Sequence, residues 1–235
     1  MLTNIDAVIF DMDGSLIDSM WIWPKVDNEY MKKYHLTMPD HFHETIEGMS
    51  YTETAQYFLD TFPSLNCTLK EVQQEWVDMT FEKYTTEVQL KPGAMEFMEK
   101  ACERGLKLGI ATSNARELVD ATLEALKISD MFASVRTSCE VSAGKPAPDV
   151  YLKVAEDISV RPEHCLVFED IPNGIQAGKN AGMKVCAVDD DFSRPLEARK
   201  KALADYFIKT YYDIPNKTYE ILNAKRKNSM FIDNL

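Results

Sequence analysis

Short apolar segments, each followed by polar or acidic residues, recur along the chain. The first spans residues 7–10 (Ala-Val-Ile-Phe) and precedes Asp11. An apolar run without alternation is typical of a strand that is buried on both faces of a parallel sheet. The same pattern predicts three more strands and a weaker fourth one, at residues 106–111, 164–168, 184–188 and 133–137 respectively.

Helical patterns separate these strands. Residues 93–104 and 117–126 carry apolar positions at helical spacing, and Gly105 is a candidate C′ glycine for the first of the two helices. Strand and helix alternate from about residue 91 to residue 208. This alternation predicts an α/β fold, with a Rossmann-like, doubly wound parallel sheet as its core and helices on both faces.

Residues 19–88 break this alternation. Three helical patterns follow one another there with no strand between them, at residues 25–34, 52–62 and 68–84. Thr68 with Glu71 fits a capping box at the start of the last helix. Because the stretch is too long for an ordinary connection, we expect an inserted helical-bundle cap domain. The expected division is a core of residues 1–18 and 89–215, the cap at 19–88, and an uncertain C-terminal tail at 216–235 with a weak helical pattern around Tyr219 and Ile221.

Composition and charge narrow the classes of protein. The chain has 235 residues and a formal net charge of −12, which opposes binding to nucleic acid or anionic lipid. No apolar run approaches the roughly 20 residues of a membrane span, and the N-terminus does not resemble a signal peptide. The five cysteines are scattered and form no Cys-x-x-Cys pair, so we expect small buried hydrophobic residues in a reducing compartment. We therefore expect a soluble, cytoplasmic monomer of enzyme size, with no nucleic-acid or membrane partner.

Four acidic side chains follow two of the predicted strands. Asp11 and Asp13 come after the first strand, and Glu169 and Asp170 come after the strand at 164–168. If the two strands are neighbours, the carboxylates converge, and two charges about 4 Å apart repel by about 4 kcal/mol at an effective dielectric of 20. Such a cluster needs a counter-charge. An incomplete shell of oxygen ligands suits Mg²⁺ better than Zn²⁺, because no histidine or cysteine is grouped with these acids.

Several other residues could bind a phosphate at the same edge of the sheet. Lys145, in a proline-rich loop, could hold a phosphate oxygen and shield the charge of a nucleophile. Thr112 and Ser113, with the backbone amides of residues 114–115 at the next helix start, offer further hydrogen bonds. Gly14 permits a sharp turn that could point its amide inward. Taken singly these features are usually turns, helix caps or surface residues, but their order after separate strands favours one site.

Together these features resemble the haloacid dehalogenase (HAD-like) superfamily, in its phosphatase and phosphomutase branch with a helical cap after the first strand. The resemblance covers about residues 5–210. Ser15 stands where Thr is more usual, and it keeps the hydroxyl. The matching segments are residues 10–19 (Phe-Asp-Met-Asp-Gly-Ser-Leu-Ile-Asp-Ser), Thr112, Lys145 within Gly-Lys-Pro-Ala-Pro-Asp, and residues 168–170 (Phe-Glu-Asp) with the glycine-containing segment that follows.

The resemblance implies a mechanism. Asp11 would attack phosphorus and form an aspartyl-phosphate, and Asp13 would protonate the leaving oxygen and then deprotonate the hydrolytic water. The transferring phosphoryl group would be bound by four residues: Thr112, Ser113, Asn114 and Lys145. The Mg²⁺ ligands would be Asp11, the backbone carbonyl of Asp13, Asp170, and Glu169 either directly or through water.

The implied function is a Mg²⁺-dependent phosphatase for a small phosphorylated metabolite, with a sugar phosphate as one candidate. Residues 47–53 resemble the cap loop that reaches into the site, and Tyr51 stands near the position where β-phosphoglucomutases carry a basic residue. A phosphomutase of that type is therefore the alternative. A non-catalytic phospho-acceptor like a response-regulator receiver is a remote third possibility, since receivers are about half this size and lack a cap.

Two pairs of residues in the cap have open roles. Trp21 and Trp23 follow the first motif and could line the entrance to the site, although core packing within the cap is the stronger expectation. His41 and His43 could suggest a metal site. With no third ligand beside them, we expect ordinary surface histidines.

Overall fold

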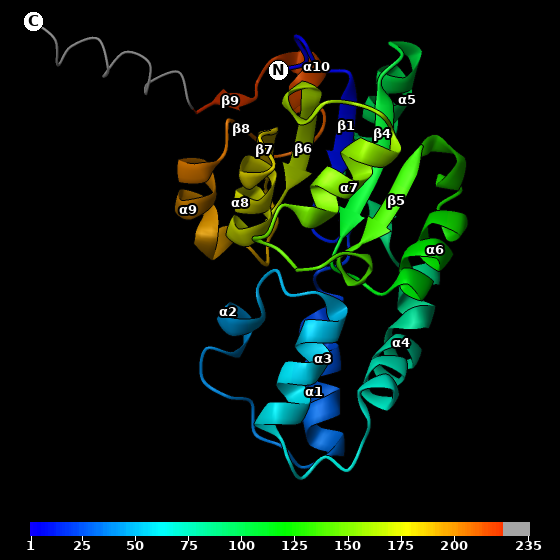
Figure 1. The fold of residues 1–235 in the computed structure, drawn as a ribbon, viewed down its shortest axis with the longest axis vertical. Coiled ribbons are helices and arrows are strands. Elements are labelled where there is room, and N and C mark those ends of the chain that lie inside the picture. Colours follow the sequence, from blue (N-terminus) through cyan, green and yellow to red (C-terminus); the bar gives the residue numbers. More distant parts are fainter. Residues whose placement is uncertain (223–235) are drawn as a thin grey trace, which may run out of the picture.

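The computed structural model describes residues 1–222, whose main feature is a seven-stranded sheet (Figure 1). The strand order is β5-β4-β1-β6-β7-β8-β9, and every pair is parallel except β8 with β9. This confirms the predicted α/β class. The strands are β1 (Ala7–Phe10), β4 (Lys107–Thr112), β5 (Ser134–Thr137), β6 (Cys165–Glu169), β7 (Lys184–Val188), β8 (Tyr206–Ile208) and β9 (Glu220–Ile221).

Helices cover both faces of the sheet. In β1, Val8 and Phe10 pack in the cluster that includes α5 and α6, whereas Ala7 and Ile9 pack in the cluster that includes α7 and α8. Both faces of this strand are therefore buried, which explains its apolar run without alternation. The helices of this part of the chain are α5 (Ala94–Glu103), α6 (Arg116–Ala125), α7 (Asp149–Asp157), α8 (Pro172–Asn180), α9 (Glu197–Leu203) and α10 (Asp213–Asn216).

A helical insert, which we define as residues 19–88, lies beyond the ends to which the strand arrows point (Figure 1). The chain enters and leaves it through a short antiparallel pair in which Ile17 lies opposite Leu90. Two of its helices begin with a complete capping box, Ser50 with Glu53 and the predicted pair Thr68 with Glu71. The elements are β2 (Ile17–Asp18), α1 (Ile22–Lys33), α2 (Phe42–Ile46), α3 (Tyr51–Thr61), α4 (Leu69–Thr86) and β3 (Gln89–Leu90).

Some expectations need correction. The short helix α2 and the strands β8 and β9 were not predicted, because each is too short to show a clear period. Around Tyr219 and Ile221 the chain forms the edge strand β9, so the weak helical pattern there is wrong up to residue 222; the rest of the tail lies outside the described residues. Of the five free cysteines, Cys102 and Cys139 are exposed rather than buried. Within residues 1–222, no helix is long and apolar enough to cross a membrane.

Candidate active site

Three neighbouring strands bring the predicted polar residues to one edge of the sheet. Asp11 directly follows β1, Thr112 is the last residue of β4, and Glu169 is the last residue of β6. β1 lies between β4 and β6 and is parallel to both. The order of strands reverses at this point, and the crevice at such a reversal is where doubly wound sheets bind ligands.

Lys145 links two of the acids. Its ammonium group donates hydrogen bonds to Asp11 Oδ1 and to Glu169 Oε1, each at 2.6 Å. All three side chains are buried or nearly so. Burial raises the pKa of Asp11 well above its usual value, against the opposing effect of Lys145. The expected juxtaposition of a cation with the candidate nucleophile is therefore present.

Three carboxylates lie close enough to share a cation. One oxygen from each of Asp11, Glu169 and Asp170 lies within 4.8 Å of the other two. Asp170 Oδ2 is buried and accepts no hydrogen bond, and burial together with Glu169 and Asp190 raises the pKa of Asp170 to about 8. An orphaned buried oxygen among hard carboxylate donors fits Mg²⁺, whose charge would oppose this rise.

Glu169 is less available than the other two acids. Its Oε1 also accepts from the Tyr151 hydroxyl at 2.8 Å, and its Oε2 accepts from the amides of Asp170 and Ile171. A side chain at Gly174 would collide with the Glu169 carboxylate, because its Cβ would lie only 1.8 Å from Oε1. Of the two predicted metal-binding roles for Glu169, contact through water agrees better with these occupied oxygens.

Gly14 is needed for a close approach between two segments and not for binding an anion. It has φ of +77°, and a Cβ there would lie 2.5 Å from Asp170 Oδ2. Its amide donates to the carbonyl of Ile17 at 3.0 Å. The expectation that this amide points toward a bound anion is therefore wrong, and the glycine instead lets the turn after β1 approach Asp170.

Asp13 is held by three donors on the side of the cavity that faces the insert. Its Oδ1 accepts from Ser19 Oγ at 2.6 Å and from the Tyr84 hydroxyl at 2.5 Å, and its Oδ2 accepts from Asn114 Nδ2 at 2.9 Å. Burial raises the pKa of Asp13, and these hydrogen bonds oppose the rise. Tyr84 comes from α4, and nothing in its local sequence distinguishes it from a core aromatic, so sequence reasoning missed it.

The residues after β4 already have partners. The amides of Asn114 and Ala115, which were expected to bind an anion, donate to Thr112 Oγ1 and to Asn114 Oδ1 respectively. The Ser113 hydroxyl lies 3.4 Å from the carbonyl of Gly48 in the insert. The phosphate-binding roles of Thr112, Ser113, Asn114 and Lys145 stay predictions, and the structure adds a positioning role toward Asp13 for Asn114.

The loop at 47–53 contacts the sheet edge, as the sequence suggested. The amide of Tyr51 donates to the carbonyl of Ser113 at 3.1 Å. Glu47 accepts from the amide of Asn173 through its carboxylate and from the Asn173 side chain through its carbonyl. These contacts close the insert over the acids at the carboxyl edge.

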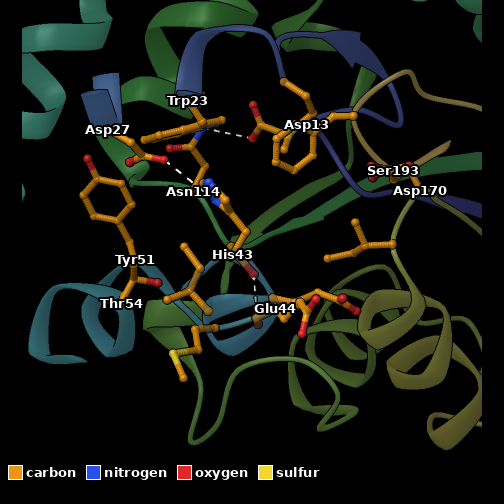
Figure 2. A pocket seen from close by; sticks show the side chains of 18 of the residues that line it. Asp13, Trp23, Asp27, His43, Glu44, Tyr51, Thr54, Asn114, Asp170 and Ser193 are labelled. Atoms are coloured by element: carbon orange, nitrogen blue, oxygen red, sulfur yellow. Dashed lines mark hydrogen bonds and ion pairs between the residues drawn. The ribbon is translucent and has the colours of Figure 1, made fainter. Parts of the chain in front are cut away.

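A cavity of about 450 Å³ lies between the insert and the sheet edge (Figure 2). Trp23 lines it and also packs against other rings, whereas Trp21 is 43% exposed, so core packing is wrong for Trp21. His41 is exposed as expected. His43 is exposed as well, with 47% of its side chain accessible, and it also lines the cavity. Among the described residues, neither histidine belongs to a cluster of possible metal ligands.

The sequence matches the family described as haloacid dehalogenase-like hydrolase over residues 8–188. The chain therefore belongs to the haloacid dehalogenase-like hydrolases, as the resemblance of its motifs indicated. The fold agrees with this assignment. CbbY from Rhodobacter sphaeroides, solved with phosphate, superimposes with a TM-score of 0.76 at 22% identity, over 88% of this chain and 95% of that one. The β-phosphoglucomutase of Clostridium difficile gives 0.74 at 20% identity, over 98% and 100%.

Curated relatives of the chain are named as phosphatases. A mitochondrial (DL)-glycerol-3-phosphatase of Arabidopsis thaliana is 32% identical over 196 residues, which are 80% of this chain and 65% of that protein. A phosphorylated carbohydrates phosphatase of Thermotoga maritima is 30% identical over 183 residues, 77% and 83% of the two chains. The chain spans only 54% of the length of another curated relative.

Proposed function

We propose that this protein is a Mg²⁺-dependent phosphatase that hydrolyses the phosphate monoester of a small metabolite through an aspartyl-phosphate on Asp11. One observation carries the proposal. Asp11 is held by Lys145 beside the orphaned oxygen of Asp170, while Asp13 is held apart by its own three donors. Two carboxyl groups in such different surroundings can take the separate roles of nucleophile and acid.

The steps follow from these surroundings. Asp11 attacks phosphorus as the ester bond breaks, and Asp13 gives its proton to the leaving oxygen. The raised pKa of Asp13 keeps that proton available. Asp13 then takes a proton from water, which attacks the phosphoryl group and restores the Asp11 carboxylate. Lys145 and Thr112 stabilise the charge that spreads over the phosphoryl oxygens.

The metal would be held by the carboxylates of Asp11 and Asp170 and by the backbone carbonyl of Asp13. Glu169 would act through water. When bound, Mg²⁺ supplies positive charge that offsets the acids and draws electron density from the phosphoryl group.

The cavity lining favours hydrolysis over a mutase reaction. A bisphosphate would need a cation for its second phosphate, and the described residues that line the cavity include neither lysine nor arginine. Tyr51, which by resemblance stands near the position where β-phosphoglucomutases carry a basic residue, is one of the lining residues.

Product analysis distinguishes a phosphatase from a mutase: isomerised sugar phosphate without net phosphate release would favour the mutase. A stable phosphoryl group on Asp11 that altered binding of a partner would favour a receiver-like role.

The names of the relatives support a phosphate ester with a sugar or related part as the first substrate class to test, because they include phosphatases of glycerol-3-phosphate and of carbohydrates. The identity of the substrate of this protein stays a proposal. The cytoplasmic location and the monomeric state likewise stay predictions from the sequence.

The proposal is tested by phosphate release from p-nitrophenyl phosphate. We expect turnover with Mg²⁺, none with excess chelator, and none with Asp11→Asn. Asp6→Asn is the matched control, since Asp6 is exposed and lies just before the same strand. Turnover without metal, or normal turnover by Asp11→Asn, would contradict the assignment.

A further inference from the structure

The cavity reaches from the catalytic acids into the insert, and the insert contributes aromatic rings to it. Asp11, Asp13 and Asp170 line it. Rings from the insert line it as well, some of them packed edge to face on their neighbours, and Trp23 packs on Tyr84, whose hydroxyl donates to Asp13. The ring-bearing lining residues of the insert are Trp23, Phe42, Tyr51, Phe58 and Trp76.

The few polar groups in this lining are mostly occupied. Thr54 Oγ1 donates to the carbonyl of Ser50 within its own helix, and Ser193 Oγ accepts from Lys200. Glu47 accepts from the amide of Asn173. A polyhydroxylated chain entering the insert would bury hydroxyls with few partners, which is costly.

Two lining groups are exceptions: the buried Tyr51 hydroxyl, which has no hydrogen-bond partner among residues 1–222, and the carboxylate of Asp27. The Asp27 side chain is only 17% exposed, and among residues 1–222 no donor forms a hydrogen bond with it. His43 Nδ1 lies 3.9 Å from Asp27 Oδ2, and burial lowers the pKa of His43, which disfavours its cationic form. Burial raises the pKa of Asp27 to about 7. A largely buried carboxylate without a donor stands ready to accept one from a ligand.

Asp27 and Trp23 belong to the same face of α1. They are four residues apart, a spacing that places side chains next to each other on a helix. Figure 2 shows Trp23, Asp27 and Tyr51 around one end of the cavity, with a dashed line joining Asp27 to His43. A ring that packs on Trp23 would therefore bring its edge toward Asp27.

We infer that the organic part of the substrate carries a flat aromatic ring with an N–H or O–H donor, which packs on Trp23 and donates to Asp27. A phosphorylated sugar that bears a heterocyclic base has this chemistry. The inference rests on the proposed function, because it takes the phosphate to bind at Asp11.

The test compares two esters that differ by the base alone. We would measure kcat/KM for uridine 5′-monophosphate and for ribose 5-phosphate with the wild-type protein and Mg²⁺. We expect the ratio to favour the nucleotide by about tenfold or more, from stacking and from the donor on the base. Calorimetric binding of both esters to Asp11→Asn gives the same ratio without turnover.

Two variants test whether Asp27 and Trp23 cause the preference for the nucleotide. We expect Asp27→Ala and Trp23→Leu each to lower the ratio about fivefold or more. Asp40→Ala and Trp21→Leu are matched controls that should keep the ratio, because both residues are exposed and neither lines the cavity. The two test variants are independent, so the failure of one to fold leaves the other.

The outcomes separate the two proposals. If p-nitrophenyl phosphate is hydrolysed but the ratio is near one in turnover and in binding, the inference about the ring is wrong and the phosphatase assignment stands. An unchanged ratio in folded Asp27→Ala and Trp23→Leu would also overturn it. If no ester, including p-nitrophenyl phosphate, is hydrolysed, the proposed function fails and the inference falls with it.

Discussion

Two carboxylates that line one cavity, the buried Asp11 and the largely buried Asp27, have different surroundings. Asp11 lies at the sheet edge, where Lys145 donates to it at 2.6 Å. Asp27 lies in the insert, where His43 Nδ1 is 3.9 Å from its Oδ2 and burial lowers the pKa of that histidine. Burial raises the pKa of both, but at Asp11 a buried lysine opposes the rise.

This difference suggests that the sheet edge carries out the reaction and that the insert side of the cavity selects the ligand. At the sheet edge most polar groups have a partner within the protein, and the described residues leave two buried oxygens without one, Asp170 Oδ2 and Asp189 Oδ1. The first of these lies in the carboxylate cluster that would hold the proposed metal. On the insert side, the carboxylate of Asp27 and the hydroxyl of Tyr51 have no hydrogen-bond partner among residues 1–222. A preorganised edge suits a charge-stabilising reaction, whereas an unfilled acceptor in an apolar cavity suits selection of a ligand.

The largest effect is expected from breaking the lysine pair at the sheet edge. Lys145→Ala leaves Asp11 and Glu169 buried without their cation, so we expect a loss of about 3–5 kcal/mol in the free energy of unfolding and at least about a thousandfold loss of kcat. Urea unfolding and initial rates measure the two. Lys153→Ala is the control, because its ion pair with Glu156 is exposed. If Lys145→Ala were stable and active, Asp11 would not depend on a buried cation, and its proposed difference from Asp27 would be wrong.

The next largest effect is expected on the Mg²⁺ dependence of activity. Asp170→Asn removes the orphaned carboxylate, so we expect the Mg²⁺ concentration for half-maximal activity to rise about 10- to 100-fold. Asp191→Asn is the control at the same edge of the sheet, since that side chain is 87% exposed. Equal Mg²⁺ dependence in both variants would remove Asp170 from the metal site.

Tyr84 connects the two regions, because it reaches Asp13 from the insert. Tyr84→Phe deletes the hydroxyl that donates to Asp13 Oδ1. We expect kcat to fall about tenfold with little change in KM, since a positioning contact to the acid is lost. Tyr212→Phe, at an exposed tyrosine bonded to Glu96, should keep both constants. A change confined to KM would place Tyr84 in substrate binding instead.

The smallest effect concerns stability and pH at Asp27. Its folded pKa of about 7 exceeds the ordinary 3.8, so ionisation opposes folding increasingly from about pH 4 up to about pH 7 and by a constant amount above that. Asp27→Asn removes this cost. We expect the variant to be about 1–3 kcal/mol more stable than wild type at pH 8 and about equal to it at pH 4. Urea unfolding at both pH values checks this, and an equal difference at both would exclude the titration of Asp27 as its source.

The sequence revealed the sheet edge far better than the insert side. Asp11, Thr112 and Glu169 each follow an apolar strand, and parallel strands bring such positions together whatever the loops do. Partners that come from helices leave no such signal. Tyr84 sits at the end of a long amphipathic helix and has the same residue type as a core tyrosine.

The same limit applies to backbone groups and to Asp27. Gly14 and Asn114 were predicted to point amides at an anion, but turn geometry, which the sequence does not specify, commits those amides to Ile17 and Thr112. Asp27 appears as one more polar position on an amphipathic helix until the fold of the insert places it in the lining of the cavity.

The central claim is that Asp11 carries the phosphoryl group during turnover. Excess protein would be mixed with p-nitrophenyl phosphate and Mg²⁺, quenched in acid within one turnover, and digested for peptide mass spectrometry. We predict one phosphoryl group on the peptide that contains Asp11, labile to hydroxylamine as an acyl phosphate is, and absent from Asp11→Asn. Release of product with no phosphoryl group on the protein at any quench time, or its capture on another residue, would contradict the account.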